Sequence, residues 1–292
     1  TLLDGDRERN GSAFFSIGGV EHSPDHALLA YALDRIGAEN YAIRVRDIAS
    51  GEELPETVEL ASGEGAVWAG DSSGFFYVER DGHQRPKRVK FHRLRSDPAS
   101  DRVVYEEPDD GFFLSIGKTL SGDFVLISCG DHTTSEVHAL PAMRPDAAPL
   151  LIAAREPGVE YSVDHRGDEF VILTNADGAV DFKIVTAPVA APGRENWRDL
   201  VPHVEGNHIL YVIVFARHMA RLERRDALPH IVILDPDGKS HEITFEEPAF
   251  ELHLVEGYEF DTDTLRFVYD SPSTPAETYD YDMAGRARTL LK

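Results

Sequence analysis

A cluster of turn-forming residues recurs along the chain at intervals of roughly 40 to 55 residues. Each cluster precedes a short apolar run, often aromatic, such as Phe75–Val78 after Asp71–Gly74. Runs of this kind are typical of strands buried on both faces. The spacing is that of β-propeller blades, which predicts a repeat protein. The six clusters are Ser23–Asp25, Asp71–Gly74, Ser121–Asp123, Arg166–Asp168, Gly206–His208 and Asp261–Asp263.

Two further strand-like runs complete each unit. In the first unit, Tyr41–Arg46 alternates polar and apolar residues, and Ser50–Gly51 supplies a turn before a fourth run. In the fifth unit, Ile231–Leu234 and the turn Asp235–Gly238 repeat this pattern. Four antiparallel strands make one propeller blade. We therefore expect an all-β fold, with one β-propeller domain over residues 1–292 that has six complete blades.

The blade bounds follow from these runs. Because each blade is covered by its neighbours, we expect one cooperative ring with no boundary between domains. Thr1–Asp4 is expected to be the last strand of an earlier blade. Arg217–Asp226 is the one contender for a helix, but charges lie all around it, so we predict an irregular loop or a hairpin. The expected blades are 11–60, 61–108, 109–155, 156–203, 204–247 and 248–292.

The charge balance limits the partners. Lys and Arg number 29 against 52 for Asp and Glu, a formal net charge of −23, which repels a phosphate backbone and disfavours nucleic acid. The same acidity fits either a plain soluble surface or a preference for cationic ligands. No apolar run reaches the length of a membrane-spanning helix, so no membrane partner is expected. Thr1 is not Met, so we expect the chain to begin inside a longer gene product.

Cys129 is the only cysteine, so no disulfide can form within the chain. This favours a reducing compartment, and we expect a cytoplasmic protein. Cys129 lies in the apolar run Phe124–Cys129, which offers no neighbouring base to activate the thiol. We therefore expect a small buried strand residue at this position.

Gly70–Gly74 reads GDSSG and matches the GxSxG pattern of serine hydrolases. A nucleophile of that kind needs a strand, a sharp turn and then a helix. Here Ala66–Ala69 and Phe75–Val78, on either side, are both strand-like. We therefore predict that Ser72 and Ser73 are turn residues.

Other chemical motifs give little. Asp-His pairs occur at His26, His132 and His165, and His203 lies five residues before His208, but none has the spacing of metal ligands. We expect turn or surface residues at these positions. The chain also lacks a GxGxxG motif, a P-loop, an HExxH motif and an EF-hand loop. We expect no cofactor and no metal.

Short segments in a shared order run from Thr1 to Lys292 and are typical of one family. They include Ser23–Asp25, Ala30–Tyr31, Phe76–Val78, Val104–Glu107, Glu160–Tyr161, Thr174–Asn175, Leu200–Pro202 and Tyr281–Met283. Taken together they resemble the propeller of oligopeptidase B and of its prolyl oligopeptidase relatives.

This resemblance implies a cytosolic-type serine oligopeptidase that cleaves short peptides after Lys or Arg. Its Ser, Asp and His triad would lie on an α/β-hydrolase domain that follows the propeller, so no catalytic residue is expected in this chain. The propeller would cap the active site and exclude folded proteins. The expected partners are that missing catalytic domain and short basic peptides.

The chain departs from the family pattern in two places. The family propeller has seven blades where this chain shows six, and the loop that carries arginine in some members reads Gly37–Glu39 here. Glu107 is the one candidate for a substrate-binding side chain, because an acidic group facing a cavity attracts a basic peptide. The alternative for Glu107 is an exposed turn carboxylate.

Two other function classes compete with the peptidase component. A stand-alone propeller that acts as a scaffold for another protein would use its faces for binding. A propeller glycosidase or lactonase would need carboxylates or metal ligands from several blades converging on one site. The sequence leaves both open.

Overall fold

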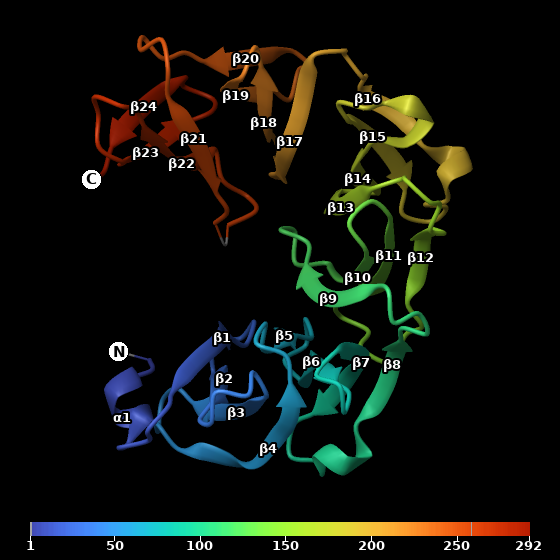
Figure 1. Ribbon diagram of the computed structural model, residues 1–292, viewed down its shortest axis with the longest axis vertical. Coiled ribbons are helices and arrows are strands. Elements are labelled where there is room, and N and C mark those ends of the chain that lie inside the picture. The colour runs from blue at the N-terminus through green and yellow to red at the C-terminus, as the bar shows by residue number, and fades with distance from the viewer. Residues whose placement is uncertain (1, 258) are drawn as a thin grey trace. The chain divides into compact units, whose positions relative to one another are not determined.

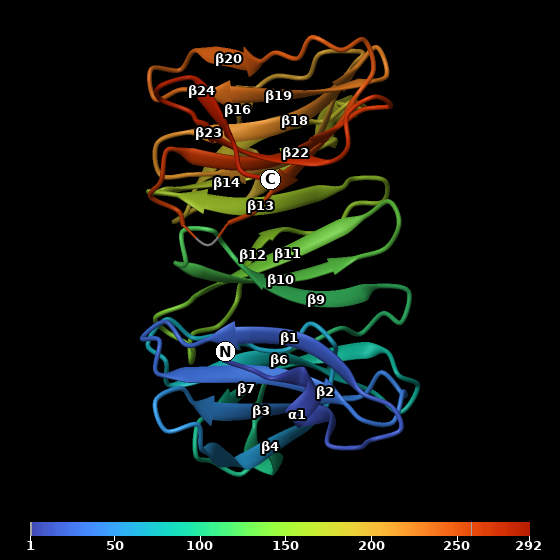
Figure 2. The ribbon, with the colours of Figure 1, turned by 90° about the vertical axis from the view of Figure 1, so that its left-hand side faces the viewer.

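β-strands make up half of this protein. The computed structural model describes residues 2–257 and 259–292, and the chain forms two compact units, Thr1–Ala154 (unit 1) and Arg155–Lys292 (unit 2). Figures 1 and 2 follow the strands in chain order by colour. Every strand pair in the described residues is antiparallel, and the strands group in fours. The predicted all-β propeller class is confirmed. The predicted blade bounds and the single ring stay predictions.

Unit 1 holds three groups of four strands. The first two groups are joined by one pairing, Ala61 of β4 with Glu79 of β6, and the third is separate. Their elements are α1 (Gly5–Arg9), β1 (Ser16–His22), β2 (Leu28–Asp34), β3 (Tyr41–Asp47), β4 (Glu53–Ala61), β5 (Val67–Trp68), β6 (Gly74–Arg80), β7 (Pro86–Arg93), η1 (Pro98–Ser100), β8 (Arg102–Glu106), β9 (Phe113–Lys118), β10 (Phe124–Gly130), β11 (Ser135–Pro141) and β12 (Leu150–Ala153).

Unit 2 holds three further four-stranded sheets, each in simple chain order. Their elements are β13 (Tyr161–Arg166), β14 (Glu169–Thr174), η2 (Ala176–Gly178), β15 (Lys183–Pro188), η3 (Arg194–Asn196), β16 (Arg198–Val201), β17 (Asn207–Val214), β18 (Met219–Arg225), β19 (Leu228–Leu234), β20 (Ser240–Ile243), β21 (Glu251–Val255), β22 (Thr264–Asp270), β23 (Glu277–Asp282) and β24 (Ala287–Leu290).

The second strand of the first sheet, β2, is apolar on both faces, because each face packs on something different. In β2, Ala30 and Ala32 join a buried cluster with Trp68 and Phe75 of the next sheet. Small residues on one sheet make room for large rings on the other, which fills the space between them. Burying such a ring contributes about 1.5–3 kcal/mol. Sheet-on-sheet packing is therefore the core of the fold.

The other face of β2 explains why the expected N-terminal strand is absent. Leu29, Tyr31 and Leu33 pack there against Leu3 and Phe15 of the N-terminal segment. Residues 2–4 form no strand, so the prediction of a last strand from an earlier blade is wrong for them; Thr1 lies outside the described residues.

Asp4 gives a second reason why this segment forms no strand. Its side chain accepts hydrogen bonds from the backbone N–H groups of Asp6 and Arg7, so it caps the first turn of α1.

The fifth group of strands is offset from its turn cluster. In the other groups the cluster lies between the first and second strands, whereas Gly206–His208 comes before and at the start of β17. The first turn of this group is instead Phe215–His218, closed by the Phe215 N–H bond to the His218 carbonyl at 2.9 Å. This turn contains no Gly, Pro, Asn or Asp, the residues from which a turn is predicted in a sequence.

Arg217–Asp226 forms a hairpin, which is one of the two structures predicted for it, the other being an irregular loop. It contains β18, which turns into β19 through Asp226 and Ala227 at φ values of 50° and 67°. A two-residue loop with both residues in the left-handed region matches the twist of the strands beside it.

The hairpin of the first sheet turns around a buried carboxylate. Asp34, 1% exposed, closes β2 and accepts hydrogen bonds from the backbone N–H groups of Ile36, Gly37 and Glu39 at 2.8–2.9 Å. Burial alone raises the pKa of Asp34, but these donors outweigh it and hold the pKa below its usual value. The loop Gly37–Glu39 thus depends on an ionised Asp34.

We expect Asp34→Asn to destabilise the chain by about 2–3 kcal/mol at pH 7. The asparagine amide has only one acceptor oxygen, whereas both oxygens of the Asp34 carboxylate accept hydrogen bonds from the loop. A lowered folded-state pKa stabilises the fold above the unfolded value, and this stabilisation disappears as pH falls through the folded value. The gap between wild type and variant should therefore narrow below about pH 4.

Urea unfolding at a series of pH values measures this gap. The matched control is Glu52→Gln, an exposed carboxylate of the neighbouring turn, which should change little. A gap that stays constant from neutral to acid pH would contradict the role of the Asp34 charge.

Candidate functional site

Glu107, the sequence-predicted substrate-binding residue, lies just after β8 and is only 1% exposed. Its Oε1 accepts a hydrogen bond from the Asp109 N–H at 2.9 Å, and its Oε2 accepts one from the Tyr105 hydroxyl at 3.0 Å. Both oxygens are used within unit 1, so the side chain is not the exposed turn carboxylate of the alternative. Its position fits a carboxylate that fastens the segment after β8. Substrate binding by Glu107 stays a prediction.

Gly70–Gly74 forms the turn between β5 and β6, as predicted. Ser72 lies in the left-handed region with a φ of 56°, and its Oγ accepts a hydrogen bond from the Asp25 N–H at 3.3 Å. The Ser73 N–H donates to Asp71 Oδ1 at 3.0 Å, which closes the turn. The context is strand, turn, strand, so the helix that a nucleophile elbow requires does not follow.

His26, His132 and His203 lie in segments between strands, whereas His165 lies in β13 and is 4% exposed, so the expectation of a turn or surface residue is wrong for His165. The His22 and His26 rings are 4.5 Å apart beside the first turn cluster. His203 and His208 both approach Asp181, with their nearest nitrogens 3.9 Å from its carboxylate oxygens. Within residues 2–257 and 259–292, no group of three or more His, Cys, Asp or Glu side chains is arranged to hold a metal ion.

Cys129 lies in β10 and is 1% exposed, so the predicted buried strand position is confirmed. It belongs to a buried polar group with Tyr105 and Glu107. Burial, followed by the contacts with Cys129 and Glu107, raises the pKa of Tyr105 above its usual range. The Tyr105 hydroxyl therefore stays protonated and acts as a hydrogen-bond donor to Glu107.

Charged groups of both signs lie along the first strands of unit 1, which the sequence analysis did not single out. Strands β1 and β5 contact each other, as do β5 and β9. Burial raises the pKa of Glu21 at the end of β1, against the opposing charges of His22 and Lys118. Burial lowers the pKa of Lys118 at the end of β9, against the charge of Glu21. We call this row of strands the first-strand edge.

Glu64 adds a second carboxylate to the first-strand edge. It lies in the loop between β4 and β5, and its Oε2 accepts a hydrogen bond from the Ile116 N–H of β9 at 3.4 Å. Burial raises the pKa of Glu64 despite this donor and the charge of Arg80. A partly desolvated carboxylate gains more from an approaching cation than a fully hydrated one does. Chemically, the first-strand edge can attract cations.

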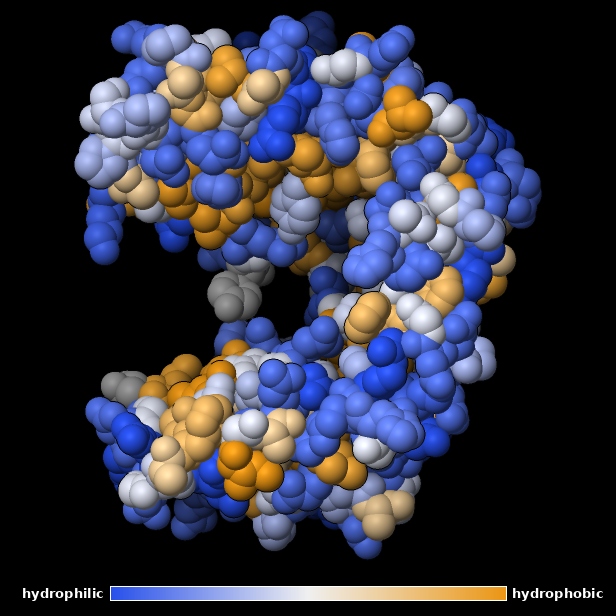
Figure 3. All heavy atoms as spheres, viewed as in Figure 1, coloured by the Kyte–Doolittle hydropathy of each residue, from blue (hydrophilic) through white to orange (hydrophobic). Residues whose placement is uncertain are grey.

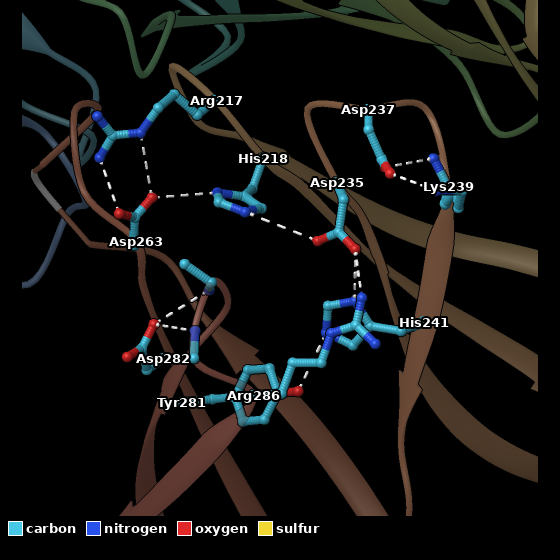
Figure 4. A network of polar contacts seen from close by, with 12 residues as sticks. Arg217, His218, Asp235, Asp237, Lys239, His241, Asp263, Tyr281, Asp282 and Arg286 are labelled. Atoms are coloured by element: carbon cyan, nitrogen blue, oxygen red, sulfur yellow. Dashed lines mark hydrogen bonds and ion pairs between the residues drawn. The ribbon is translucent and has the colours of Figure 1, made fainter.

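In unit 2 a polar network joins four turns of the fifth and sixth sheets (Figure 4). His218 Nδ1 lies 3.2 Å from Asp263 Oδ1, and His218 Nε2 lies 3.7 Å from Asp235 Oδ1. Arg217 holds the same Asp263 with two hydrogen bonds at 2.8 and 3.2 Å. The network therefore fastens the fifth sheet to the sixth.

Asp235 is the hub of this network. Its Oδ2 accepts hydrogen bonds from His241 Nδ1 and Arg286 Nη2, both at 3.0 Å, and the other His241 nitrogen meets the Tyr281 hydroxyl at 3.0 Å. The aspartates belong to turns visible in the sequence, but Arg217 and Arg286 lie 46 and 51 residues away from the aspartates that they contact. No local sequence signal indicates that these residues meet.

The face seen in Figure 3 is largely hydrophilic, with hydrophobic residues gathered in a few contiguous areas. This agrees with the net charge of −23. In the part of the chain that the structure describes, no helix has the length and apolar content needed to cross a membrane.

Comparison with known proteins gives one family along the whole chain. Residues 1–292 match the family model described as prolyl oligopeptidase, N-terminal beta-propeller domain. Dipeptidyl aminopeptidase BI of Pseudoxanthomonas mexicana is 39% identical over 292 residues, which are all of this chain and 40% of that protein. Protease 2 of Moraxella lacunata is 30% identical over 280 residues, 96% of this chain and 40% of that protein. The chain thus spans about 40% of the length of these relatives.

Solved structures agree with the sequence matches. Oligopeptidase B from Leishmania major superposes with a TM-score of 0.93 at 29% identity, covering 100% of this chain and 42% of that one. Oligopeptidase B from Trypanosoma brucei gives 0.91 at 30% identity with the same coverage. With its four-stranded antiparallel sheets and this match along its length, the chain belongs to the prolyl oligopeptidase family of peptidases and is its N-terminal β-propeller domain.

Proposed function

We propose that this chain is the access-controlling propeller of a serine oligopeptidase that cleaves short peptides after Lys or Arg. The observation that carries the proposal is the match of all 292 residues to the propeller domain of the family, while the relatives are much longer. In this proposal the Ser, Asp and His triad lies on an α/β-hydrolase domain of the same gene product. The propeller admits short chains and keeps folded proteins from the active site.

Charge supports the preference for basic peptides. The chain carries 52 acidic against 29 basic residues, and the first-strand edge places Glu21 in a half-buried position and Glu64 in an exposed one. Low-dielectric walls around such carboxylates concentrate their field and raise the local concentration of cations. A peptide that carries Lys or Arg is favoured by this field over a neutral or acidic one.

Local geometry supports a non-catalytic chain. The one GxSxG match is a turn between strands, with Ser72 Oγ engaged by a backbone N–H group. Nucleophilic catalysis requires a base within hydrogen-bonding reach of the nucleophile and an oriented third group behind it. We also propose a cytoplasmic location, which the single buried Cys129 supports because it needs no oxidising compartment.

Two other functions have separate support. The 39% identical relative is named a dipeptidyl aminopeptidase, which favours release of dipeptides from a free N-terminus as the second candidate. A scaffold for another protein is the third, because one fold can host unrelated functions. The substrates in the next experiment separate these candidates.

The 292-residue chain should not hydrolyse an arginyl reporter peptide, whereas the full-length gene product should. The reason is that the propeller controls access and supplies no nucleophile. Ser72→Ala with Ser73→Ala should leave kcat/KM of the full-length product unchanged. Reporters with blocked and free N-termini are compared in parallel.

Cleavage of the blocked reporter supports the oligopeptidase, and cleavage of the free reporter alone supports the dipeptidyl aminopeptidase. An inactive full-length product leaves the scaffold as the better account. Turnover by the 292-residue chain that the double alanine change abolishes would place the active site in the GDSSG turn and sink the proposal.

Removing charge from the first-strand edge should weaken use of basic peptides. For the full-length product, Glu21→Gln with Glu64→Gln should raise KM for a dibasic peptide about two- to fivefold at low salt, with kcat unchanged. The effect should fade at high salt, because salt screens such fields. Steady-state kinetics at two ionic strengths measure it, with Glu52→Gln as the matched control. If Glu52→Gln raised KM for the dibasic peptide as much as the double variant does, the first-strand edge would have no specific role in attracting basic peptides.

A further inference from the structure

A cavity of about 270 Å³ in unit 2 is lined by the loop between β20 and β21 and by the strands β22, β23 and β24. Aromatic rings, carboxylates and one guanidinium share its lining. These side chains belong to Phe245, Tyr279, Glu246, Glu247, Glu277 and Arg288. Ring faces attract organic cations, and carboxylates add the opposite charge. We call this site the aromatic cavity.

The rings form a continuous aromatic wall. Phe245 stacks on Tyr269 with the ring centroids 5.0 Å apart, and Tyr279 stacks on Phe267 at 5.4 Å. Phe245 also meets Phe267 edge to face at 5.9 Å, which joins the two stacks. Because each ring is held by its neighbours, the wall is fixed before any ligand arrives. The faces of such rings carry partial negative charge.

Arg288 demonstrates that this wall accepts a guanidinium. Its Cζ atom lies 5.2 Å from the centroid of the Phe245 ring and 5.6 Å from that of the Tyr279 ring. Both distances lie within the range of cation–π attraction. Arg288 Nη1 also donates a long hydrogen bond of 3.3 Å to the Thr244 carbonyl oxygen. The side chain is exposed, so it can leave the rings for solvent.

Neutral donors hold two of the carboxylates in place. Glu247 accepts hydrogen bonds from the Ser273 hydroxyl at 3.0 Å and from the Thr274 hydroxyl at 2.8 Å. Glu277 accepts one from the Tyr279 hydroxyl at 2.5 Å. Hydroxyl donors position a carboxylate without cancelling its charge. Both carboxylates are therefore oriented and still negative.

The charge balance of the aromatic cavity is negative. Its lining carries three carboxylates and one guanidinium. Within residues 2–257 and 259–292, none of these four side chains forms an ion pair. The cavity therefore has an excess of two negative charges beside a wall that already accepts one cation. A second cation gains from both features.

We propose that the aromatic cavity binds the side chain of a Lys or Arg in a peptide, and that Arg288 fills the site until such a ligand displaces it. The cation of the ligand stacks on Phe245 and Tyr279 and is attracted by Glu247 and Glu277. The choice of a basic peptide as the ligand rests on the proposed function. The binding itself depends only on side chains of this chain.

Binding of N-acetylarginine amide to the 292-residue chain tests the proposal. Nuclear magnetic resonance titration of the aromatic ring signals measures Kd. The citrulline analogue has nearly the same shape but no charge, so it should bind about tenfold more weakly or worse. Glu247→Gln with Glu277→Gln should weaken arginine binding about five- to tenfold, because the positioned charges are lost.

Arg288→Gln should change Kd in the opposite direction. A site that an internal side chain fills for part of the time binds its ligand more weakly, so removing the Arg288 guanidinium should tighten arginine binding about threefold or more. A variant that misfolds cannot produce tighter binding, so this readout is independent of any damage to the loops in the glutamine double variant.

Glu205→Gln removes an exposed carboxylate before β17 in the same unit and is the matched control, which should keep the wild-type Kd. Equal affinity for the arginine and citrulline ligands, or an unchanged or weaker affinity in Arg288→Gln, would overturn the proposal. Hydrolysis is not read in this assay. A full-length product without peptidase activity would therefore contradict the proposed function and leave the binding result as it stands.

Discussion

Face-to-face packing of sheets is the constraint on which the rest of this structure depends. A strand in the middle of such a stack must be apolar on both faces, as β2 is, with Leu29 and Tyr31 toward one side and Ala30 and Ala32 toward the other. The interior has the density of a crystal, so small residues must face large ones. Most of the polar side chains described above therefore lie at turns, strand ends and the edges of the sheets, and buried ones such as Arg221 and Glu223 of β18 are paired.

That confinement decides where chemistry can occur. The carboxylates of the first-strand edge, the network around Asp235 and the turn at Ser72 all lie at such margins. Polar groups that do enter the core are engaged by neighbouring polar groups: Glu107 accepts hydrogen bonds from Tyr105 and Asp109, and His92 contacts Asp101. In the function proposed above, the charged groups at these margins attract the peptide, and the buried polar groups stabilise the packing of the strands.

The sequence predicted what local patterns encode. Turn clusters and apolar runs located the strands, and the strand-like flanks of Gly70–Gly74 identified the serines as turn residues. Failures arose where tertiary contacts outweighed local signals. Leu3 packs on β2 and Asp4 caps a helix where a strand was expected, and the Phe215–His218 turn has no turn-forming residue. The burial of Glu107 and the approach of Arg288 to Phe245 depend on residues distant in sequence, so no local pattern could reveal them.

The central claim is that this chain belongs to a serine peptidase without holding its nucleophile. A fluorophosphonate probe, which labels only activated serines, tests this most directly when the labelled full-length product is mapped by mass spectrometry. The account predicts one labelled serine, which lies outside the 292-residue sequence of this chain. A label on Ser72 or Ser73 that is lost when the protein is unfolded before labelling would contradict it.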